Sequence, residues 1–400
     1  MKFGRIAVTI MLACTPWVTV ARAELPATIK IGVLNDRSGP FADQSGRGSV
    51  IAAEMAAQDF ATEAPGIPVE IVYGDHQNKP DIGSSIVRGW IDRDGVVAVA
   101  DAVNSAVALA VNDILRARHL TFVASSAATS DLTGKFCAPT TVQWTLDTWA
   151  LGNSAARALK DLGPFYFVSF DYALGSVLER DTTAALQKLG GSVAGSIKHP
   201  LGTTDFSAYL LQAQASGAKV IAFANTGTDF INAVKQAAEF GLTKTATLTG
   251  LFTQITDIEA LGLPAAQGLI ATEAFYWDLN DQTRAFTKRF AEKMPGRVPT
   301  AGQAGVYSSV LAYLRAVKAA HSVVGEQVMA AMRKVPIDDP LFGPVTVRVD
   351  GRAVHAMHVF RVKTPAQSTS RWDVYTPIAT IPAAEAFRPL DDGGCKLVSN

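Results

Sequence analysis

Short apolar segments alternate with amphipathic helical segments over the first third of the chain. The apolar runs are nearly continuous, which is typical of parallel strands buried on both faces. Between them, apolar residues recur at helical spacing. The pattern predicts strands at residues 29–34, 69–74, 96–102 and 121–124, with helices near 52–60, 82–91 and 105–117. We therefore expect a lobe built on a parallel sheet that helices cover on both sides.

A second series of the same kind begins near residue 165. It predicts strands at 165–170, 192–197, 220–224 and 245–248, with helices near 176–188, 206–215 and 230–240. Two longer helices at 282–293 and 302–320 follow, and Asp350-Gly351 signals a hairpin. The predicted fold class is α/β, with two Rossmann-like lobes whose cores are parallel sheets. Ligands bind beyond the carboxyl ends of such strands, so the two lobes predict a cleft that holds a ligand.

The N-terminal 23 residues have the features of an export signal. Lys2 and Arg5 precede an apolar run at 6–13, and Ala21-Arg22-Ala23 offers a small-x-small cleavage site. A membrane anchor is the alternative, but the apolar stretch is shorter than the ~20 residues that span a bilayer. A lipoprotein attached through Cys14 is a second alternative. We expect cleavage after Ala23 and a periplasmic protein.

The charge balance argues against a nucleic-acid partner. Lys+Arg and Asp+Glu both number 36, and 48% of the residues are hydrophobic. Removing Lys2, Arg5 and Arg22 with the signal leaves 33 bases against 36 acids, a net charge of −3. The mature chain therefore has no basic surplus with which to neutralise phosphates.

Two cysteines remain after cleavage, Cys137 and Cys395. In an oxidising compartment a pair of this kind predicts a disulfide, with two free thiols as the alternative. Both lie among loop residues, where the backbone can adapt to the geometry of the bond.

Motifs of catalysis and metal binding are missing from the sequence. It has no G-x-S-x-G, Walker, G-x-G-x-x-G or H-E-x-x-H pattern, and its six histidines are scattered. His76 follows a predicted strand at the end that faces the cleft. A surface or hydrogen-bonded histidine is a simpler interpretation of this residue than a catalytic one. We expect a protein that is not an enzyme and holds no metal or cofactor.

Small hydroxyl and amide residues follow two neighbouring strands of the first series. Asn104-Ser105-Ala106 opens a helix, and Ser125 to Thr129 follows the next strand. Such loops leave backbone N–H groups open, which suits an anion such as a carboxylate. Helix capping alone is the other interpretation, since Ser and Asn serve it equally well.

Several motifs in order resemble the leucine/isoleucine/valine-binding proteins of bacterial ABC transporters, over about residues 28–363. They are Ile29 to Leu34 with Ser38-Gly39-Pro40-Phe41-Ala42, Ala127-Ala128-Thr129 with Asp131-Leu132-Thr133, Asp171 to Gly175, Thr204 to Ser207, Gly343-Pro344 and Val359-Phe360. The resemblance implies a type I periplasmic binding protein, a monomer whose lobes are joined by a three-segment hinge. It would deliver a small carboxylate ligand to ABC permease subunits in the inner membrane.

On this resemblance, residues 28–147 with 277–356 form the first lobe, and 148–276 with 357–376 form the second. Residues 377–400 are expected as a C-terminal tail. Ser105, the Ala127 backbone and Thr129 would hold the carboxylate of the ligand. The other expected ligand-binding residues are Gln44, Asn104, Ala128, Tyr172, Asn225, Thr226, Asp229, Phe252 and Tyr276.

One position departs from the family pattern. Amino-acid binders of this family place an acidic residue near 252 to pair with the α-ammonium of the ligand, and here Phe252 stands there. A desolvated ammonium without a carboxylate partner is costly. We therefore expect an organic acid without the amino group, aromatic acids included. The alternatives are a true branched-chain amino-acid binder, with Asp229 or Glu273 as the substitute acid, and a ligand-sensing receptor domain.

Overall fold

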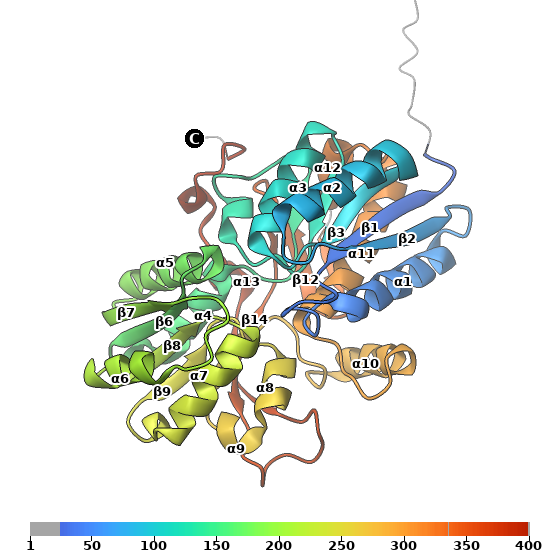
Figure 1. Ribbon diagram of the computed structural model, residues 1–400. Coiled ribbons are helices and arrows are strands. Elements are labelled where there is room, and N and C mark those ends of the chain that lie inside the picture. Colours follow the sequence, from blue (N-terminus) through green and yellow to red (C-terminus); the bar gives the residue numbers. More distant parts are fainter. Residues whose placement is uncertain (1–24, 335, 399–400) are drawn as a thin grey trace, which may run out of the picture.

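The computed structural model describes residues 25–334 and 336–398, and it forms two lobes (Figure 1). The predicted signal peptide, residues 1–23, lies outside the described residues. Each lobe has a mainly parallel sheet with helices on both faces, so the predicted fold class is confirmed. Among the described residues, no helix is both long and apolar enough to cross a membrane.

The first lobe holds a five-stranded parallel sheet in the order β2-β1-β3-β4-β5. Its strands are β1 (Ile29–Asn35), β2 (Val69–Asp75), β3 (Val96–Asp101), β4 (Thr121–Ala124) and β5 (Thr141–Gln143). Helices α1 and α11 pack against each other, as do α2 and α3. The helices of this lobe are α1 (Gly46–Glu63), α2 (Pro80–Gly89), α3 (Ser105–Ala117), α10 (Asp281–Lys293), α11 (Ala301–Ala320) and α12 (Gly325–Lys334).

The second lobe holds a seven-stranded sheet in the order β15-β14-β10-β9-β8-β6-β7, in which β14 runs antiparallel to both of its neighbours, β10 and β15. Its strands are β6 (Phe165–Phe170), β7 (Val193–His199), β8 (Val220–Ala224), β9 (Thr247–Gly250), β10 (Ile270–Glu273), β14 (Met357–Val362) and β15 (Tyr375–Ile381). The helices are α4 (Thr148–Leu159), α5 (Ala173–Lys188), α6 (Ser207–Ala215), α7 (Gly227–Glu239), α8 (Ile255–Leu261) and α9 (Leu263–Ala266). The short helix α13 (Ala383–Ala386) follows β15.

The predicted hairpin and disulfide are both present. Strands β12 (Gly343–Val347) and β13 (Ala353–Val354) pair antiparallel around Asp350-Gly351, and β11 (Ile337–Asp339) pairs with β12. Gly351 has φ +84° and a Cβ there would lie 2.3 Å from the Thr141 carbonyl oxygen, so the turn requires glycine. Cys137 and Cys395 form a disulfide with their Cα atoms 5.6 Å apart.

Some elements were not predicted from the hydrophobic pattern. Helix α4 is buried on nearly every side, so its sequence lacks the alternating polar face that marks an amphipathic helix. Strand β15 crosses residue 376, where we expected the second lobe to end and the tail to begin.

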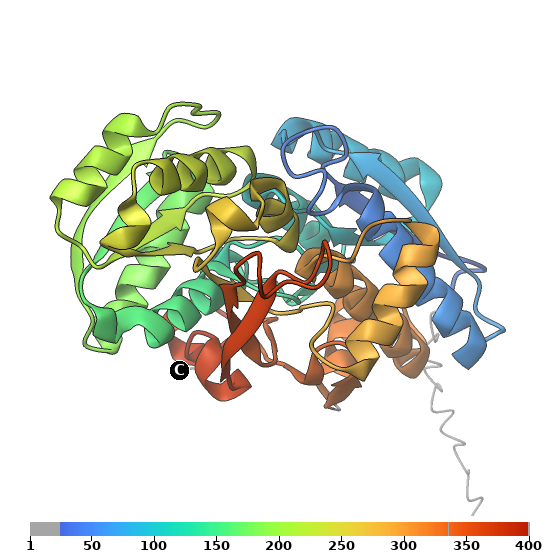
Figure 2. The same cartoon turned by 90° about the horizontal axis from the view of Figure 1, so that it is seen from below.

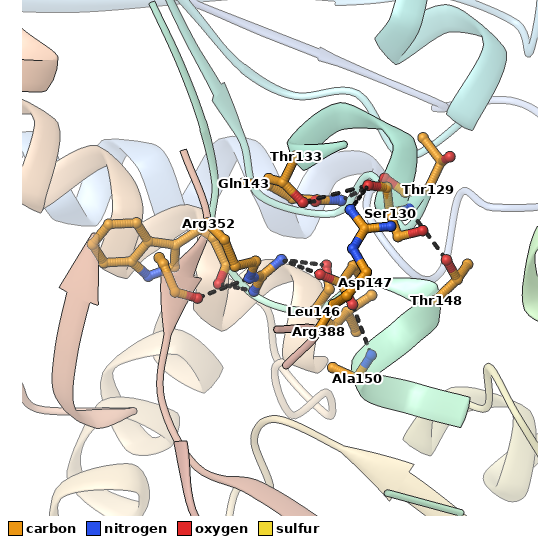
Figure 3. A network of polar contacts seen from close by, with 12 residues as sticks. Thr129, Ser130, Thr133, Gln143, Leu146, Asp147, Thr148, Ala150, Arg352 and Arg388 are labelled. Atoms are coloured by element: carbon orange, nitrogen blue, oxygen red, sulfur yellow. Dashed lines mark hydrogen bonds and ion pairs between the residues drawn. The ribbon is translucent and has the colours of Figure 1, made fainter. Parts of the chain in front are cut away.

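Up to β15, the described chain passes between the two lobes three times, and two of these passages lie side by side. The first follows β5 and the third precedes β14, and Gln143 pairs in parallel with Arg352 where they meet. The Arg352 guanidinium is fully buried and donates to the carbonyl oxygens of Trp144 (2.6 Å) and Leu146 (3.0 Å) (Figure 3). One arginine therefore ties two of the three passages together.

Candidate ligand site between the lobes

A small cavity lies where the two lobes meet. Loops of the first lobe, the first passage, the loop after β9 and the first turn of α11 all contribute to its wall. The lining residues are Gln44, Val103, Ser126, Leu146, Phe252, Gln254 and Gly302. The cavity is therefore a shared feature of both lobes, as the predicted cleft requires.

Helices α3, α7 and α11 begin beside this cavity, as does the short helix α8 after Gln254. Asn104 caps α3, because its Oδ1 accepts from the amides of Ala106 (2.9 Å) and Val107 (3.1 Å). Thr300 caps α11 and its hydroxyl also donates to the Gln44 carbonyl (2.8 Å), which places Gln44 at the cavity. Thr226 precedes the first turn of α7. Helix N-termini carry partial positive charge, so this arrangement favours an anionic group.

The backbone at the end of β3 is turned sharply toward the cavity. Asp101 and Ala102 have φ values of +79° and +60°, a region that non-glycine residues seldom adopt. Such conformations cost about 1–3 kcal/mol each and persist where the surrounding structure holds them. The turn brings Val103 into the wall of the cavity and Asn104 to the start of α3.

The loop expected to bind the ligand carboxylate, Ala127-Ala128-Thr129, is buried. Residues at both ends of the first passage donate hydrogen bonds to it. The Gln143 side-chain amide donates to the carbonyl oxygens of Ala127 (2.7 Å) and Thr129 (3.0 Å) (Figure 3). The Thr148 amide donates to the Ala128 carbonyl at 2.7 Å. These bonds engage the carbonyl groups of the loop and fix its orientation. Ser105, also expected here, is buried in the first turn of α3.

Two hydrogen bonds cross from one lobe to the other beside the cavity. The Gln44 amide donates to the Thr226 hydroxyl at 2.8 Å, and the Tyr172 hydroxyl donates to Asn104 Oδ1 at 3.0 Å. Four of the residues expected at the site therefore meet in two pairs. Phe252, a fifth, lines the cavity directly and is only 3% exposed.

Other expected residues have partners away from the cavity. Asn225 donates to His199 Nε2 at 3.0 Å, and Asp229 accepts from the amides of Gly202 (2.9 Å) and Thr203 (3.2 Å). Asp229 thus organises the loop that follows β7.

Tyr276 belongs to an aromatic group at the second passage between the lobes. Its ring packs on Phe360 and Tyr375, and its hydroxyl donates to the Trp372 carbonyl at 3.3 Å. Its neighbour Phe275 packs against Phe286. These contacts place Tyr276 and Phe275 in the packing around the second passage.

Val103, Leu146, Gln254 and Gly302 line the cavity without having been expected there. Gln254 and Leu146 each follow a strand by a few residues, so their place beyond a strand end was a usable signal. Gly302 comes from a helix far along the chain, and only the packing of α11 brings it to the cavity.

Among the described residues that line the cavity, none has an ionisable side chain. Glu273, named above as a substitute acid, is buried and accepts from the Tyr375 hydroxyl at 2.8 Å. Burial raises the pKa of Glu273 well above its ordinary value. Burial likewise raises the pKa of Asp101 to about 6, although the neighbouring polar side chains of Ser126, Ser49 and Asn35 oppose the shift. Within residues 25–334 and 336–398, no group of three or more His, Cys, Asp or Glu side chains is placed to hold a metal ion.

Two lobes with mainly parallel sheets that meet around a cavity are the architecture of bilobal binding proteins. Residues 28–369 match the family described as periplasmic binding protein, and the chain belongs to this family. It is therefore a solute-binding protein.

Relatives of known name or structure agree with this assignment. A Leu/Ile/Val-binding protein homolog 6 from Brucella melitensis is 30% identical over 275 residues, which are 67% of this chain and 69% of that protein. A periplasmic binding protein from Burkholderia mallei is 40% identical, with a TM-score of 0.88 over 93% of this chain and 100% of that one. A branched-chain amino acid ABC transporter periplasmic ligand-binding protein from Burkholderia xenovorans is 38% identical, with a TM-score of 0.85 over 92% and 100% of the two chains.

A more distant structure shares the fold. It is an ABC transporter solute-binding protein from R. palustris in complex with benzoate, 20% identical, with a TM-score of 0.79 over 92% of this chain and 99% of that one.

Proposed function

We propose that this chain is the periplasmic solute-binding protein of an ABC importer and that it binds a small carboxylate without an amino group, aromatic acids included. The observation that carries the proposal is the uncharged wall of the cavity. Phe252 lies where an ammonium-binding acid is expected, and Gln44, Ser126 and Gln254 supply the polar groups. The benzoate bound to the R. palustris protein shows that this fold accommodates such an acid.

The carboxylate of the ligand would lie toward the start of α3 and the 127–133 loop. Partial positive charge at the helix N-terminus and the buried hydroxyl of Thr129 favour an anion there. The body of the ligand would contact Phe252, where aromatic contacts contribute about 0.5–1.5 kcal/mol beyond burial.

Closure would capture the ligand. The bonds Gln44–Thr226 and Tyr172–Asn104 join the lobes only when these come together over the cavity. A ligand that contacts both walls stabilises the closed arrangement over the open one, because it gains interactions only there. The closed protein would then deliver the ligand to its permease subunits.

A thermal-shift screen tests the proposed ligand class. Protein that has been unfolded, stripped of ligand and refolded is mixed with benzoate, 4-methylpentanoate, leucine, isoleucine and valine. A ligand at 100 times its Kd adds about 2.7 kcal/mol of stability, which is several degrees in a chain of this length. We expect only the amine-free acids to raise the melting temperature.

A strong shift by leucine, with none by the acids, would replace this proposal with branched-chain amino-acid binding. The names of the Brucella and Burkholderia xenovorans relatives favour that second candidate. A shift by none of the five compounds would remove small monocarboxylates as the ligand class.

A further inference from the structure

The C-terminal segment lies beside the region where the two lobes meet (Figure 2). On the second lobe, Asn153 Nδ2 donates to the Glu385 carbonyl at 2.6 Å, and Arg157 pairs with the Glu385 carboxylate at 2.7 Å. Farther along, Lys188 of α5 pairs with Asp392. Residues 385–392 are therefore attached to helices α4 and α5.

The same segment is attached to the first lobe. The disulfide joins Cys395 to Cys137, and Arg348 Nη1 donates to the Arg388 carbonyl at 2.7 Å. The Arg388 guanidinium in turn donates to the Ser130 carbonyl at 2.9 Å (Figure 3). Ser130 directly follows Thr129, so this bond reaches the loop where we place the ligand carboxylate.

Arg388 passes between two glycines whose lack of a side chain makes room for it. A Cβ on Gly134 would lie 2.9 Å from Arg388 Nη2, and a Cβ on Gly393 would lie 2.8 Å from the same atom. Either addition would displace the guanidinium or the backbone. The Arg388 guanidinium can therefore occupy this position only because residues 134 and 393 are both glycine.

The segment also rests on the hinge. The ring of Phe387 lies 4.3 Å from the Arg352 guanidinium carbon and 5.3 Å from the ring of His355. Phe387 is 4% exposed, so it is part of the packing around the paired passages.

We propose that residues 383–398, called the clasp, form a fourth connection between the lobes, and that Arg388 is a positioning residue for the 127–133 loop. The role of this loop in binding the ligand rests on the proposed function, whereas the fourth connection between the lobes does not depend on it. The clasp is held to the second lobe by Asn153, Arg157 and Lys188, and to the first by the disulfide and Arg388. It therefore restrains opening and keeps the loop in its binding orientation.

Hydrogen–deuterium exchange of the ligand-free protein tests the clasp without any ligand. We expect Arg388→Ala to raise the exchange of amides 130–136 about tenfold, because loss of a hydrogen bond from a charged group changes a local opening equilibrium by about that factor. Arg388→Lys should restore part of the protection. Arg371→Ala is the matched control, since this exposed arginine pairs with Glu259 inside the second lobe.

Two further measurements use milder changes, in case Arg388→Ala folds poorly. Gly393→Ala keeps the arginine at position 388 but crowds its guanidinium, so it should give the same local increase in amide exchange. Reduction of the disulfide in the wild-type protein should enlarge the radius of gyration measured by small-angle X-ray scattering. Unchanged exchange at 130–136 in both variants, or an equal increase in Arg371→Ala, would overturn the proposal.

Ligand binding gives a separate readout. If benzoate stabilises the wild-type protein, Arg388→Ala should weaken its binding about tenfold, with little change in Arg371→Ala. Unchanged benzoate affinity in Arg388→Ala would remove its positioning role. Failure of the wild-type protein to bind benzoate would count against the proposed ligand, while the exchange data would still decide the clasp.

Discussion

At the scale of single residues, the side chain at position 252 sets the charge of the cavity wall. Phe252 lies beside two glutamines and a serine, and no carboxylate among the described lining residues faces the ligand space. An ammonium brought there would lose its water without gaining a counter-charge, which is strongly unfavourable. On the proposed function, the choice between an acid and an amino acid as ligand would depend on this one residue.

Phe252→Glu should reverse this preference. The new carboxylate would offer a partner to an ammonium and would repel a carboxylate ligand. We expect the ratio of leucine affinity to 4-methylpentanoate affinity to rise at least about tenfold, or 1.4 kcal/mol, as measured by isothermal titration calorimetry. Phe252→Gln is the uncharged control. An equal loss of both ligands in Phe252→Glu would show that position 252 does not read the amino group.

Asp101 makes stability depend on pH. Its pKa is raised from 3.8 to about 6, so the folded protein binds this proton more tightly than the unfolded chain does. The resulting stabilisation is complete below pH 3.8 and is lost as the pH rises through 6. Asparagine cannot ionise, so Asp101→Asn should gain up to about 3 kcal/mol relative to wild type between pH 4 and pH 7.5.

Urea unfolding of both proteins at the two pH values measures this difference. Comparing variant with wild type cancels the contributions of other titrating groups, such as the buried His355, whose pKa is lowered to about 4. Asp113→Asn, at an exposed ion pair with Arg116, is the control. A difference between Asp101→Asn and wild type that does not vary with pH would contradict the prediction.

At the scale of elements, the hinge is organised by one buried side chain. Arg352 donates to the carbonyl oxygens of Trp144, Leu146 and Ala353, and lies 3.5 Å from the Asp147 carboxylate. Burial lowers the pKa of Arg352 to about 10, so the group remains charged at neutral pH. Leu146 lines the cavity, so Arg352 also sets one part of the ligand wall.

Arg352→Met should therefore destabilise the protein severely. The variant keeps an apolar stem of similar length but removes the guanidinium bonds to three carbonyl groups and leaves the buried Asp147 carboxylate without its counter-charge. Removing one partner from a buried charged cluster costs about 3–5 kcal/mol. Urea unfolding measures the loss, with Arg361→Met on an exposed position of β14 as the control. A loss below 1 kcal/mol would mean that water replaces the guanidinium.

At the scale of the whole molecule, the disulfide closes a loop of 258 residues that includes all strands and helices of the second lobe. A cross-link of this span restricts the unfolded chain, because it removes many extended conformations. It also ties the C-terminal end to the first lobe.

Reduction should lower the free energy of unfolding by about 5 kcal/mol in the chain-entropy model. Urea unfolding with and without a reductant measures the effect, and non-reducing mass analysis confirms that the bond is present. The Cys137→Ser/Cys395→Ser variant should match the reduced protein and should not respond to reductant. A loss in the reduced protein that the double variant does not reproduce would assign the effect to the reductant itself.

Local patterns along the chain were sufficient for the two-lobe architecture. Nearly continuous apolar strands such as Phe165–Phe170 can be buried only in a sheet covered on both faces, and the intervening helices make that sheet parallel. The Asp350-Gly351 turn and the Cys137–Cys395 bond were also predictable, because turn chemistry and a lone pair of cysteines in an oxidising compartment leave few choices.

The sequence thus determined the fold class and the family, and it placed residues such as Asn104 and Phe252 a few positions beyond strand ends. Only the tertiary structure decided that Gly302 and Leu146 share the cavity wall, that Tyr276 packs at the hinge, and that Arg388 reaches Ser130. The reason is physical. Periodicity and turn chemistry act between neighbours in the chain, whereas these contacts join segments far apart in it, and the packing of the two lobes alone brings them together.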